Sequence, residues 1–198
     1  MERPTKEQIN ELPLFEGMAL DNIKLVTNPE ESAAAVAELT QCAVVGFDTE
    51  SKPVFKKGEV SDGPHLIQFS NSEKAFLFPT QFTSTLADIE RLLSDPDLKK
   101  VGFGLSDDKK VLQRKFAIKI ANAEELSTRV KHFTGVKQNV GARAAVAMLL
   151  NQRLSKGAQR SNWSKLPLQP HQLKYAANDA YSALLVYMKL EQGESSLS

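Results

Sequence analysis

Strand-like and helix-like patterns of apolar residues alternate along the first half of the chain. Residues 22–27 (NIKLVT) alternate between apolar and polar as in a β-strand, and residues 28–41 contain helix-forming Ala, Glu and Leu behind an Asn-Pro start. Residues 42–50 (CAVVGFDTE) are a β-branched apolar run that ends in acids, which predicts a central strand. Residues 65–71 and 74–80 predict two further strands joined as a hairpin.

The second half of the chain is mostly helical in pattern. A short strand is predicted over residues 99–105, because this apolar run is followed by Ser and two Asp that suit the start of a helix. Helices are predicted over residues 83–95, 106–116, 124–133, 139–152 and 171–190, with a basic linker at residues 154–169. An antiparallel strand group followed by strand–helix alternation indicates an α/β fold, a mixed sheet flanked by helices.

The length and composition are those of one compact domain. With 198 residues, of which 41% are apolar, the chain is long enough to bury a substantial core. We assign residues 1–20 to an N-terminal extension, residues 21–191 to the domain and residues 192–198 to a polar tail.

The chain shows no membrane-directed or disulfide pattern. No stretch approaches about 18 consecutive apolar residues, and the first residues lack the apolar segment of a signal peptide, so a cytoplasmic location is expected. Cys42 is the single cysteine, which excludes an internal disulfide and a multi-cysteine zinc site. Its apolar neighbours predict a buried thiol in the core.

Charge is divided unevenly along the chain, although the formal net charge is only +1. Residues 1–125 hold 15 Lys/Arg against 21 Asp/Glu, whereas residues 126–178 hold nine Lys/Arg and no acid. A long acid-free stretch is typical of a surface that faces phosphates, because neutralised phosphates release counterions. A solvated basic face of an ordinary protein has the same signature, so charge alone leaves both interpretations open.

Carboxylates stand at three places where the predicted elements begin or end. Asp48 and Glu50 are two residues apart, so on a continuing strand both side chains project from one face. Crowded carboxylates raise each other's pKa unless a cation neutralises them, and Mg²⁺ or Mn²⁺ prefers such hard oxygen ligands. An exposed strand-to-loop transition is the alternative for this pair alone.

Two further acids belong to predicted helices. Asp107 and Asp108 lie at a predicted helix start, where the helix dipole favours negative charge. Tyr175 and Asp179 are four residues apart and share one face of the last helix. That face is otherwise apolar, and an ionised Asp there is costly unless it is paired or metal-bound. A core aromatic is the alternative for Tyr175.

The order of these residues resembles the DEDDy branch of the DEDD superfamily, the ribonuclease D-like and Werner-type 3′→5′ exonuclease domains. The resemblance runs from VVGFDTESKPVF through HLIQFS and KKVGFGLSDDKKVL to LSKGAQRSNWSKLPLQPHQLKYAANDAYSALLVY, most of residues 43–190. It implies a ribonuclease H-like mixed sheet of antiparallel and parallel strands. The related branch that uses a His five residues before the last Asp does not match, because Lys174 occupies that position.

The resemblance also implies a set of catalytic roles. Asp48, Glu50 and Asp179 would hold one divalent cation, Mg²⁺ or Mn²⁺, and Asp48 would bridge to a second cation near Asp108. Asp108 is chosen over Asp107 because an apolar residue follows it four positions later, and Asp107 would then be a helix cap. Tyr175 would orient the attacking water. The implied activity is a two-metal 3′→5′ exonuclease that releases nucleoside 5′-monophosphates from DNA or RNA.

Residues outside the carboxylate set are candidates for nucleic-acid contacts. Trp163 would either stack on a base or anchor the linker to the core. A loop after Glu50 would either contact the terminal nucleotide or stay uninvolved. The candidate phosphate contacts are Lys156, Gln159 and Arg160, with Lys165 close by, and the loop candidates are Phe55, Lys56 and Lys57.

Three other functions are alternatives to the exonuclease. The first is a nucleic-acid-binding module that keeps the fold but not the catalysis, and the second is a ribonuclease H-type nuclease that cuts internally. The third is a small-molecule phosphohydrolase, for which the basic stretch would be surplus. The YxxxD pattern at Tyr175 and Asp179 favours the exonuclease.

Overall fold

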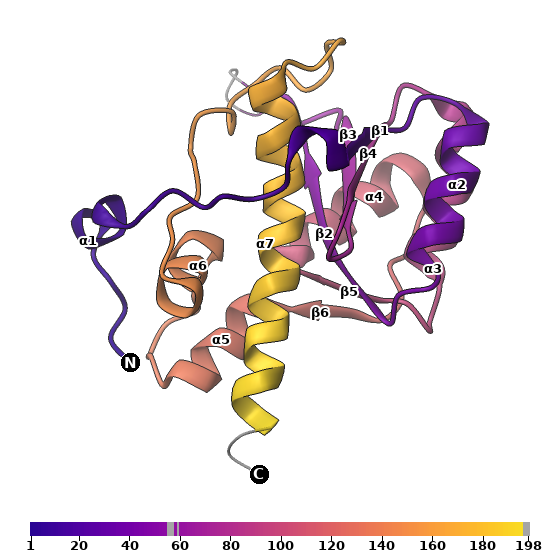
Figure 1. Cartoon of the computed structure of the whole chain (residues 1–198). Coiled ribbons are helices and arrows are strands. Elements are labelled where there is room, and N and C mark those ends of the chain that lie inside the picture. The colour runs from indigo at the N-terminus through magenta and orange to yellow at the C-terminus, as the bar shows by residue number, and fades with distance from the viewer. Residues whose placement is uncertain (55–57, 59, 196–198) are drawn as a thin grey trace.

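A six-stranded mixed sheet organises the molecule (Figure 1). The computed structural model describes residues 1–54, 58 and 60–195. The strands are ordered β1-β4-β3-β2-β5-β6; β2, β3 and β4 pair antiparallel, while β1, β5 and β6 each pair parallel with their neighbours β4, β2 and β5. In chain order the strands are β1 Ile23–Leu25, β2 Val44–Glu50, β3 Leu66–Ser70, β4 Ala75–Pro79, β5 Lys99–Gly102 and β6 Ala123–Glu125. The predicted mixed sheet and the hairpin of β3 and β4 are confirmed.

Helices cover both faces of the sheet (Figure 1). One core lies between the sheet and helices α2, α3 and α4, and two further clusters lie on the side of α7. The helices are α1 Lys6–Glu11, α2 Pro29–Leu39, α3 Leu86–Ser94, α4 Leu105–Phe116, α5 Leu126–Thr134, α6 Ala142–Leu150 and α7 Pro170–Ser195, with short 3₁₀ turns at Leu20–Asn22 and Thr83–Thr85.

Strand β2 and helix α7, which carry three of the four predicted metal-binding acids, are packed directly against each other. Gly46 in β2 makes this possible, because a Cβ atom at that position would overlap the backbone carbonyl of Ala180 in α7. Where two backbones approach this closely, only glycine fits, because every other residue has a Cβ atom. The contact places α7 over the end of β2, where Asp48 and Glu50 lie.

Three details differ from the pattern-based expectations. Residues 123–125 form the edge strand β6, although the pattern there predicted the start of a helix. The last helix, predicted over residues 171–190, continues through Ser195 and so into the segment expected to be a polar tail. Cys42 is half-buried against the first core rather than fully buried, and burial raises the pKa of its thiol.

The first 20 residues follow the surface beside α6 and α7 (Figure 1). Phe15 and Met18 are buried in the clusters on the α7 side. The backbone N–H of Met18 donates to the Asn178 side chain at 2.9 Å, and Gly17 takes the left-handed conformation beside the same Asn178 side chain. This segment is therefore fixed to α7.

Over the residues that the structure describes, no helix is long and apolar enough to cross a membrane.

Candidate active site

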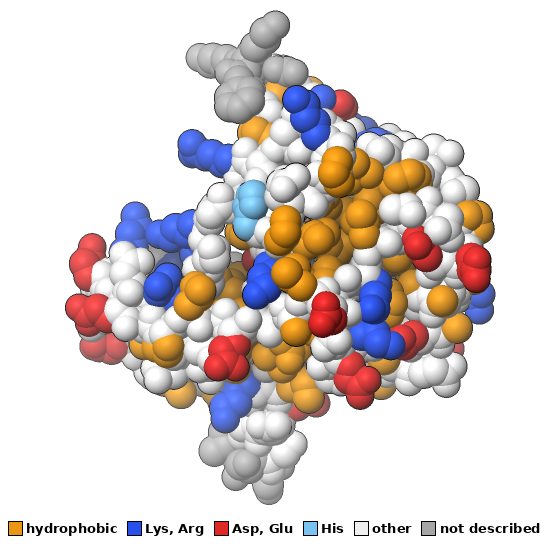
Figure 2. All heavy atoms as spheres, turned by 45° about the horizontal axis from the view of Figure 1, so that its top comes forward, with side chains coloured by type: hydrophobic (Ala, Val, Ile, Leu, Met, Phe, Trp, Pro, Cys, Tyr) orange, Lys and Arg blue, Asp and Glu red, His pale blue; other side chains and the backbone are white. Residues whose placement is uncertain are grey.

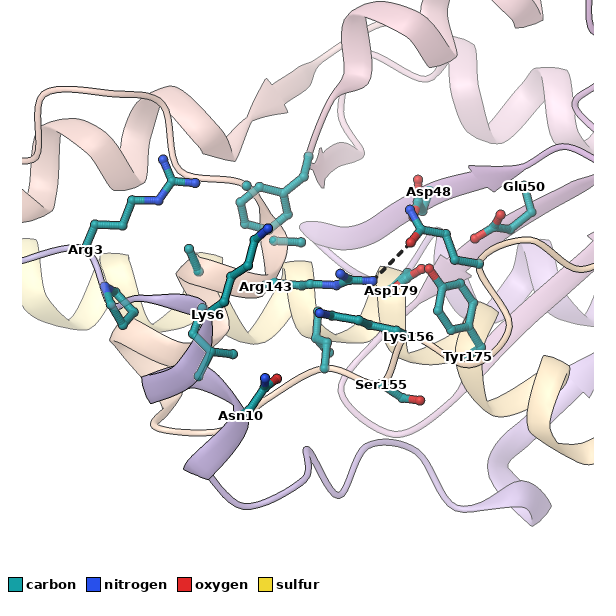
Figure 3. Close-up of a pocket in the computed structure, with 18 of the residues that line it drawn as sticks. Arg3, Lys6, Asn10, Asp48, Glu50, Arg143, Ser155, Lys156, Tyr175 and Asp179 are labelled. Carbon is teal, nitrogen blue, oxygen red and sulfur yellow. Dashed lines mark hydrogen bonds between the residues drawn. The ribbon is translucent and has the colours of Figure 1, made fainter. Parts of the chain in front are cut away.

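Three carboxylates from β2 and α7 converge at one point (Figure 3). Asp48, Glu50 and Asp179 each offer an oxygen atom, and these atoms all lie within 4.8 Å of one another. The strand period of two puts Asp48 and Glu50 on the same face, and the close packing at Gly46 brings Asp179 to them. All three residues are half-buried.

Asp108 stands next to this group without joining it. It lies in the first turn of α4 and is 8% exposed, and the Thr49 hydroxyl donates to its carboxylate at 2.5 Å. The side chain of Asp107 is 88% exposed and pairs with Lys110 at 3.0 Å, so it points away from the site. The expectation that Asp107 caps this helix is wrong, because the cap position is held by Gly104, which has no side chain to offer.

Burial and mutual repulsion make the carboxylates hold protons. Desolvation first, and then the charges of Asp179 and Asp108, raise the pKa of Glu50 to about 9. Desolvation and the neighbouring acids also raise the pKa of Asp48 well above its ordinary value. Desolvation raises the pKa of Asp179 to about 7, although hydrogen bonds from Tyr175 and Glu50 and the positive charge of Arg143 oppose this. The group therefore cannot be fully ionised at neutral pH without added positive charge.

Tyr175 stands one helical turn before Asp179 and is half-buried. Desolvation first, and then the negative charge of Asp179 and Glu50, raise the pKa of its phenol. A hydrogen bond to Asp179 has the same effect. The hydroxyl is therefore a hydrogen-bonding group and not a proton acceptor at neutral pH.

A cavity of about 820 Å³ opens in front of the carboxylates. In the space-filling view a recess on the left has Lys and Arg side chains around it (Figure 2). Lys156 and Gln159, both predicted nucleic-acid contacts, line the cavity together with Arg143 of α6. Arg143 donates to the Gln159 side chain at 3.1 Å.

Arg143 is not among the residues predicted to contact nucleic acid. The acid-free stretch contains nine basic residues, and nothing in the sequence distinguishes Arg143 from the other eight. The fold separates these nine: Arg129 pairs with Glu124, Glu191 and Glu194, whereas Arg143 and Lys156 face the cavity. Only part of the basic stretch is therefore available to a ligand.

Several predicted nucleic-acid contacts have a different place in the structure. Trp163 is 1% exposed and packs with its ring centroid 6.0 Å from that of Tyr175, so stacking on a base is corrected to the anchoring role. Arg160 is exposed but does not line the cavity. Phe55, Lys56 and Lys57 lie outside the described residues.

Comparison with known proteins agrees with this geometry. The sequence model described as 3′-5′ exonuclease matches residues 23–193, which is most of the chain. This chain belongs to the 3′-5′ exonuclease family. A relative from Mus musculus, the bifunctional 3′-5′ exonuclease/ATP-dependent helicase WRN, is 34% identical over 151 residues, 74% of this chain and 11% of that protein. The exonuclease chain therefore spans about a tenth of this relative's length.

Solved structures share the fold. The EXO domain of Aedes aegypti Nibbler superposes with a TM-score of 0.79 at 22% identity, covering 91% of this chain and 92% of that one. Trypanosoma brucei RNase D in complex with RNA U12 superposes with a TM-score of 0.76 at 21% identity, covering 93% of this chain and 64% of that one. The shared fold, together with the observed sheet of antiparallel and parallel strands flanked by helices, confirms the predicted fold class.

The family implies divalent cations, and the side chains at the site fit them. The donor set consists of carboxylate oxygens, which are the ligands that hard cations prefer. The raised pKa values show that positive charge is needed at this point to ionise all three acids. A binding site for at least one divalent cation is consistent with both observations.

Proposed function

We propose that this exonuclease domain removes nucleotides from the 3′ end of DNA or RNA, with Mg²⁺ or Mn²⁺ held by Asp48, Glu50 and Asp179. The observation that carries the proposal is the convergence of these three acids within 4.8 Å at the floor of a basic cavity. Asp108 and Asp48 would hold a second cation. When bound, the cations would supply positive charge that neutralises the phosphate and stabilises the departing oxygen.

The overall reaction is hydrolysis of the terminal phosphodiester bond. The oxygen of a water molecule forms a bond to phosphorus as the bond from phosphorus to the 3′ oxygen of the preceding nucleotide breaks. That 3′ oxygen takes up a proton and ends the shortened strand, and a nucleoside 5′-monophosphate is released. The chain's own side chains position the water and the phosphate for this exchange.

Tyr175 orients the attacking water through its hydroxyl. Because its pKa is raised, the phenol keeps its proton and acts as a hydrogen-bonding group rather than as a base. Thr49 has a supporting role, since its hydroxyl holds the Asp108 carboxylate at 2.5 Å.

Arg143 and Lys156 bind the phosphates of the strand. Both line the cavity, and the positive charge of Arg143 opposes the rise in the pKa of Asp179 that burial causes. Gln159 holds Arg143 in place. The complex of the Trypanosoma brucei RNase D with RNA supports a nucleic-acid ligand for this fold. The cytoplasmic location expected from the sequence stays a prediction.

The test uses oligonucleotides of DNA and of RNA, labelled at either the 5′ or the 3′ end, with Mg²⁺ or Mn²⁺ and with excess chelator. The expected products are a ladder that shortens stepwise from the 5′-labelled strand and a labelled mononucleotide from the 3′-labelled strand, both only with metal. Asp179→Asn should abolish both products. Internal fragments would favour the ribonuclease H-type activity, and binding without any cleavage would favour the inactive module.

A further inference from the structure

The first residues of the chain form one wall of the active-site cavity. The N-terminal arm, which we define as residues 1–12, includes the short helix α1 and lies across the cavity from the carboxylates (Figure 3). Six of its residues line the cavity: Arg3, Pro4, Thr5, Lys6, Ile9 and Asn10. The family match begins only at residue 23, so this wall lies outside the matched region.

The arm is held in this place by the residues that directly follow it in the sequence, which pair with the body of the domain. The backbone around Leu14 pairs with Arg153: Phe15 donates to the Arg153 carbonyl, and Arg153 donates to the Pro13 carbonyl, each at 2.9 Å. The Arg153 side chain also donates to the Leu12 carbonyl at 2.9 Å. The next residue, Phe15, is 6% exposed and packs in one of the two clusters on the side of α7. The end of the arm is therefore tied to the body of the domain.

Core packing does not explain the position of α1. None of its residues is buried, and a capping box between Thr5 and Gln8 stabilises the helix locally. Lys6 and Asn10 are exposed and line the cavity, and no hydrogen bond or ion pair joins the Lys6 side chain to the rest of the described chain. A free ammonium group facing a cavity is available to a ligand.

Charge is segregated around this short helix. Lys6 lines the cavity, whereas Glu7 and Glu11 of the same helix do not. Figure 3 shows Arg143 and Lys156 between the arm and the carboxylates, so basic groups continue from α1 to the catalytic end. The half-buried side chains of Ile9 and Phe103 add apolar surface to the same cavity.

An extended polyanion with apolar faces is the ligand that matches all of these groups together. A mononucleotide at the carboxylates would meet Arg143 and Lys156 but would leave the arm without a partner. A single nucleic-acid strand carries a phosphate at every nucleotide, and its exposed bases pack on apolar side chains. Such a strand would follow the cavity from the carboxylates to α1.

We propose that the N-terminal arm is a binding wall for the single strand upstream of the 3′-terminal nucleotide, with Lys6 as a phosphate contact. The proposal rests on the proposed function, because it takes the carboxylates as the place of the 3′ end. Its consequence is that affinity for a strand depends on a segment that is not part of the catalytic core. Arg3 reaches toward the 138–139 loop and acts mainly in holding the arm.

The test compares Lys6→Glu with Lys119→Glu, which makes the same charge change at an exposed residue that does not line the cavity. Binding of a 5′-fluorescein-labelled 12-nucleotide strand is measured by anisotropy in excess chelator, at several salt concentrations. We expect Lys6→Glu to weaken binding about fivefold or more and to flatten the plot of log affinity against log salt concentration by about 0.7, the value for one phosphate contact on a single strand. Lys119→Glu should differ little from the wild type.

Both variants should keep the wild-type melting temperature, because neither side chain is buried. Equal affinities and equal salt slopes for the two variants would overturn the role of the arm. Hydrolysis of the same strand by the wild type, after metal is added, is scored separately. A wild type that binds but does not cleave would refute the proposed function, while the comparison of the two lysine variants would still decide the role of the arm.

Discussion

Glu50 is expected to destabilise the metal-free protein, and its removal should therefore make the fold more stable. The carboxyl group of Glu50 has a pKa of about 9 in the folded chain, against an ordinary value of 4.5, because of burial first and then the charges of Asp179 and Asp108. At pH 7 the unfolded chain has released this proton and the folded chain has kept it. Folding must therefore take up a proton, which costs free energy.

The size of this cost follows from the two pKa values. The cost at pH 7 accumulates from the ordinary pKa of 4.5 up to pH 7, because over this range the folded group keeps a proton that the unfolded group has lost. Each pH unit is worth about 1.4 kcal/mol, so the upper limit is about 3.5 kcal/mol. The site opens to a cavity, and water there screens part of the repulsion. We expect Glu50→Gln to raise the free energy of unfolding of the metal-free protein by about 1–2 kcal/mol, which is about 2–8 °C in melting temperature.

The effect has a defined dependence on pH. Because the folded-state pKa is raised for an acid, the folded state binds more protons than the unfolded state between about pH 4.5 and pH 9. The wild type should therefore lose stability as pH rises through this window, relative to Glu50→Gln. Below about pH 4.5 the difference should vanish, since both states then hold the proton.

The assay is chemical denaturation in excess chelator at several pH values from 5 to 9, for the wild type, Glu50→Gln and the control Glu125→Gln. Glu125 is a carboxylate at the end of β6 that accepts from the backbone N–H groups of Leu105 at 2.8 Å and Ser127 at 3.0 Å. Desolvation opposes its ionisation, but hydrogen bonds to Ser127 and to nearby backbone groups outweigh this and lower its pKa. Glu125→Gln should therefore destabilise the protein by about 1 kcal/mol.

Added Mg²⁺ should reverse the order of wild type and Glu50→Gln, because a cation that binds only the folded wild type stabilises it. A Glu50→Gln variant that is less stable than the wild type in chelator at pH 8 would refute the reasoning. So would a stability difference that is the same at pH 5 and at pH 9.

Three further predictions test the site and its support. Tyr175→Phe should lower single-turnover hydrolysis of a labelled oligonucleotide by about 10²-fold with little change in strand binding, because the ring stays and only the water-orienting hydroxyl is lost; a normal rate would remove Tyr175 from the mechanism. Asp108→Asn should be severely impaired in hydrolysis and the exposed Asp107→Asn nearly normal, and the opposite ranking would exchange their roles. Gly46→Ala should cost about 1–3 kcal/mol in urea denaturation and reduce metal affinity measured by calorimetry, since its Cβ meets the Ala180 carbonyl; wild-type values for both would show that α7 does not depend on this contact.

The sequence by itself determined the strand and the helix that carry the catalytic acids, and the chemistry of those acids. Period-two spacing put Asp48 and Glu50 on one face of a strand, and the four-residue spacing put Tyr175 and Asp179 on one face of a helix, because local geometry fixes both relations. The order of these residues also determined the family. Pattern reasoning was less able to find β6, whose three residues Ala-Glu-Glu have no β-branched or alternating signal and form a strand only because β5 offers a free edge.

Only the tertiary structure decided which of several chemically equivalent residues reach the site. Asp107 and Asp108 are adjacent in sequence, and the direction of α4 against β2 buries one and exposes the other. Trp163 is equally suited to stacking or packing until its burial beside Tyr175 is known. The N-terminal arm and the basic stretch are far apart in the sequence, and the pairing of Leu14 with Arg153 brings them to one cavity. Such contacts depend on the free energy of the whole packed chain, which no local pattern encodes.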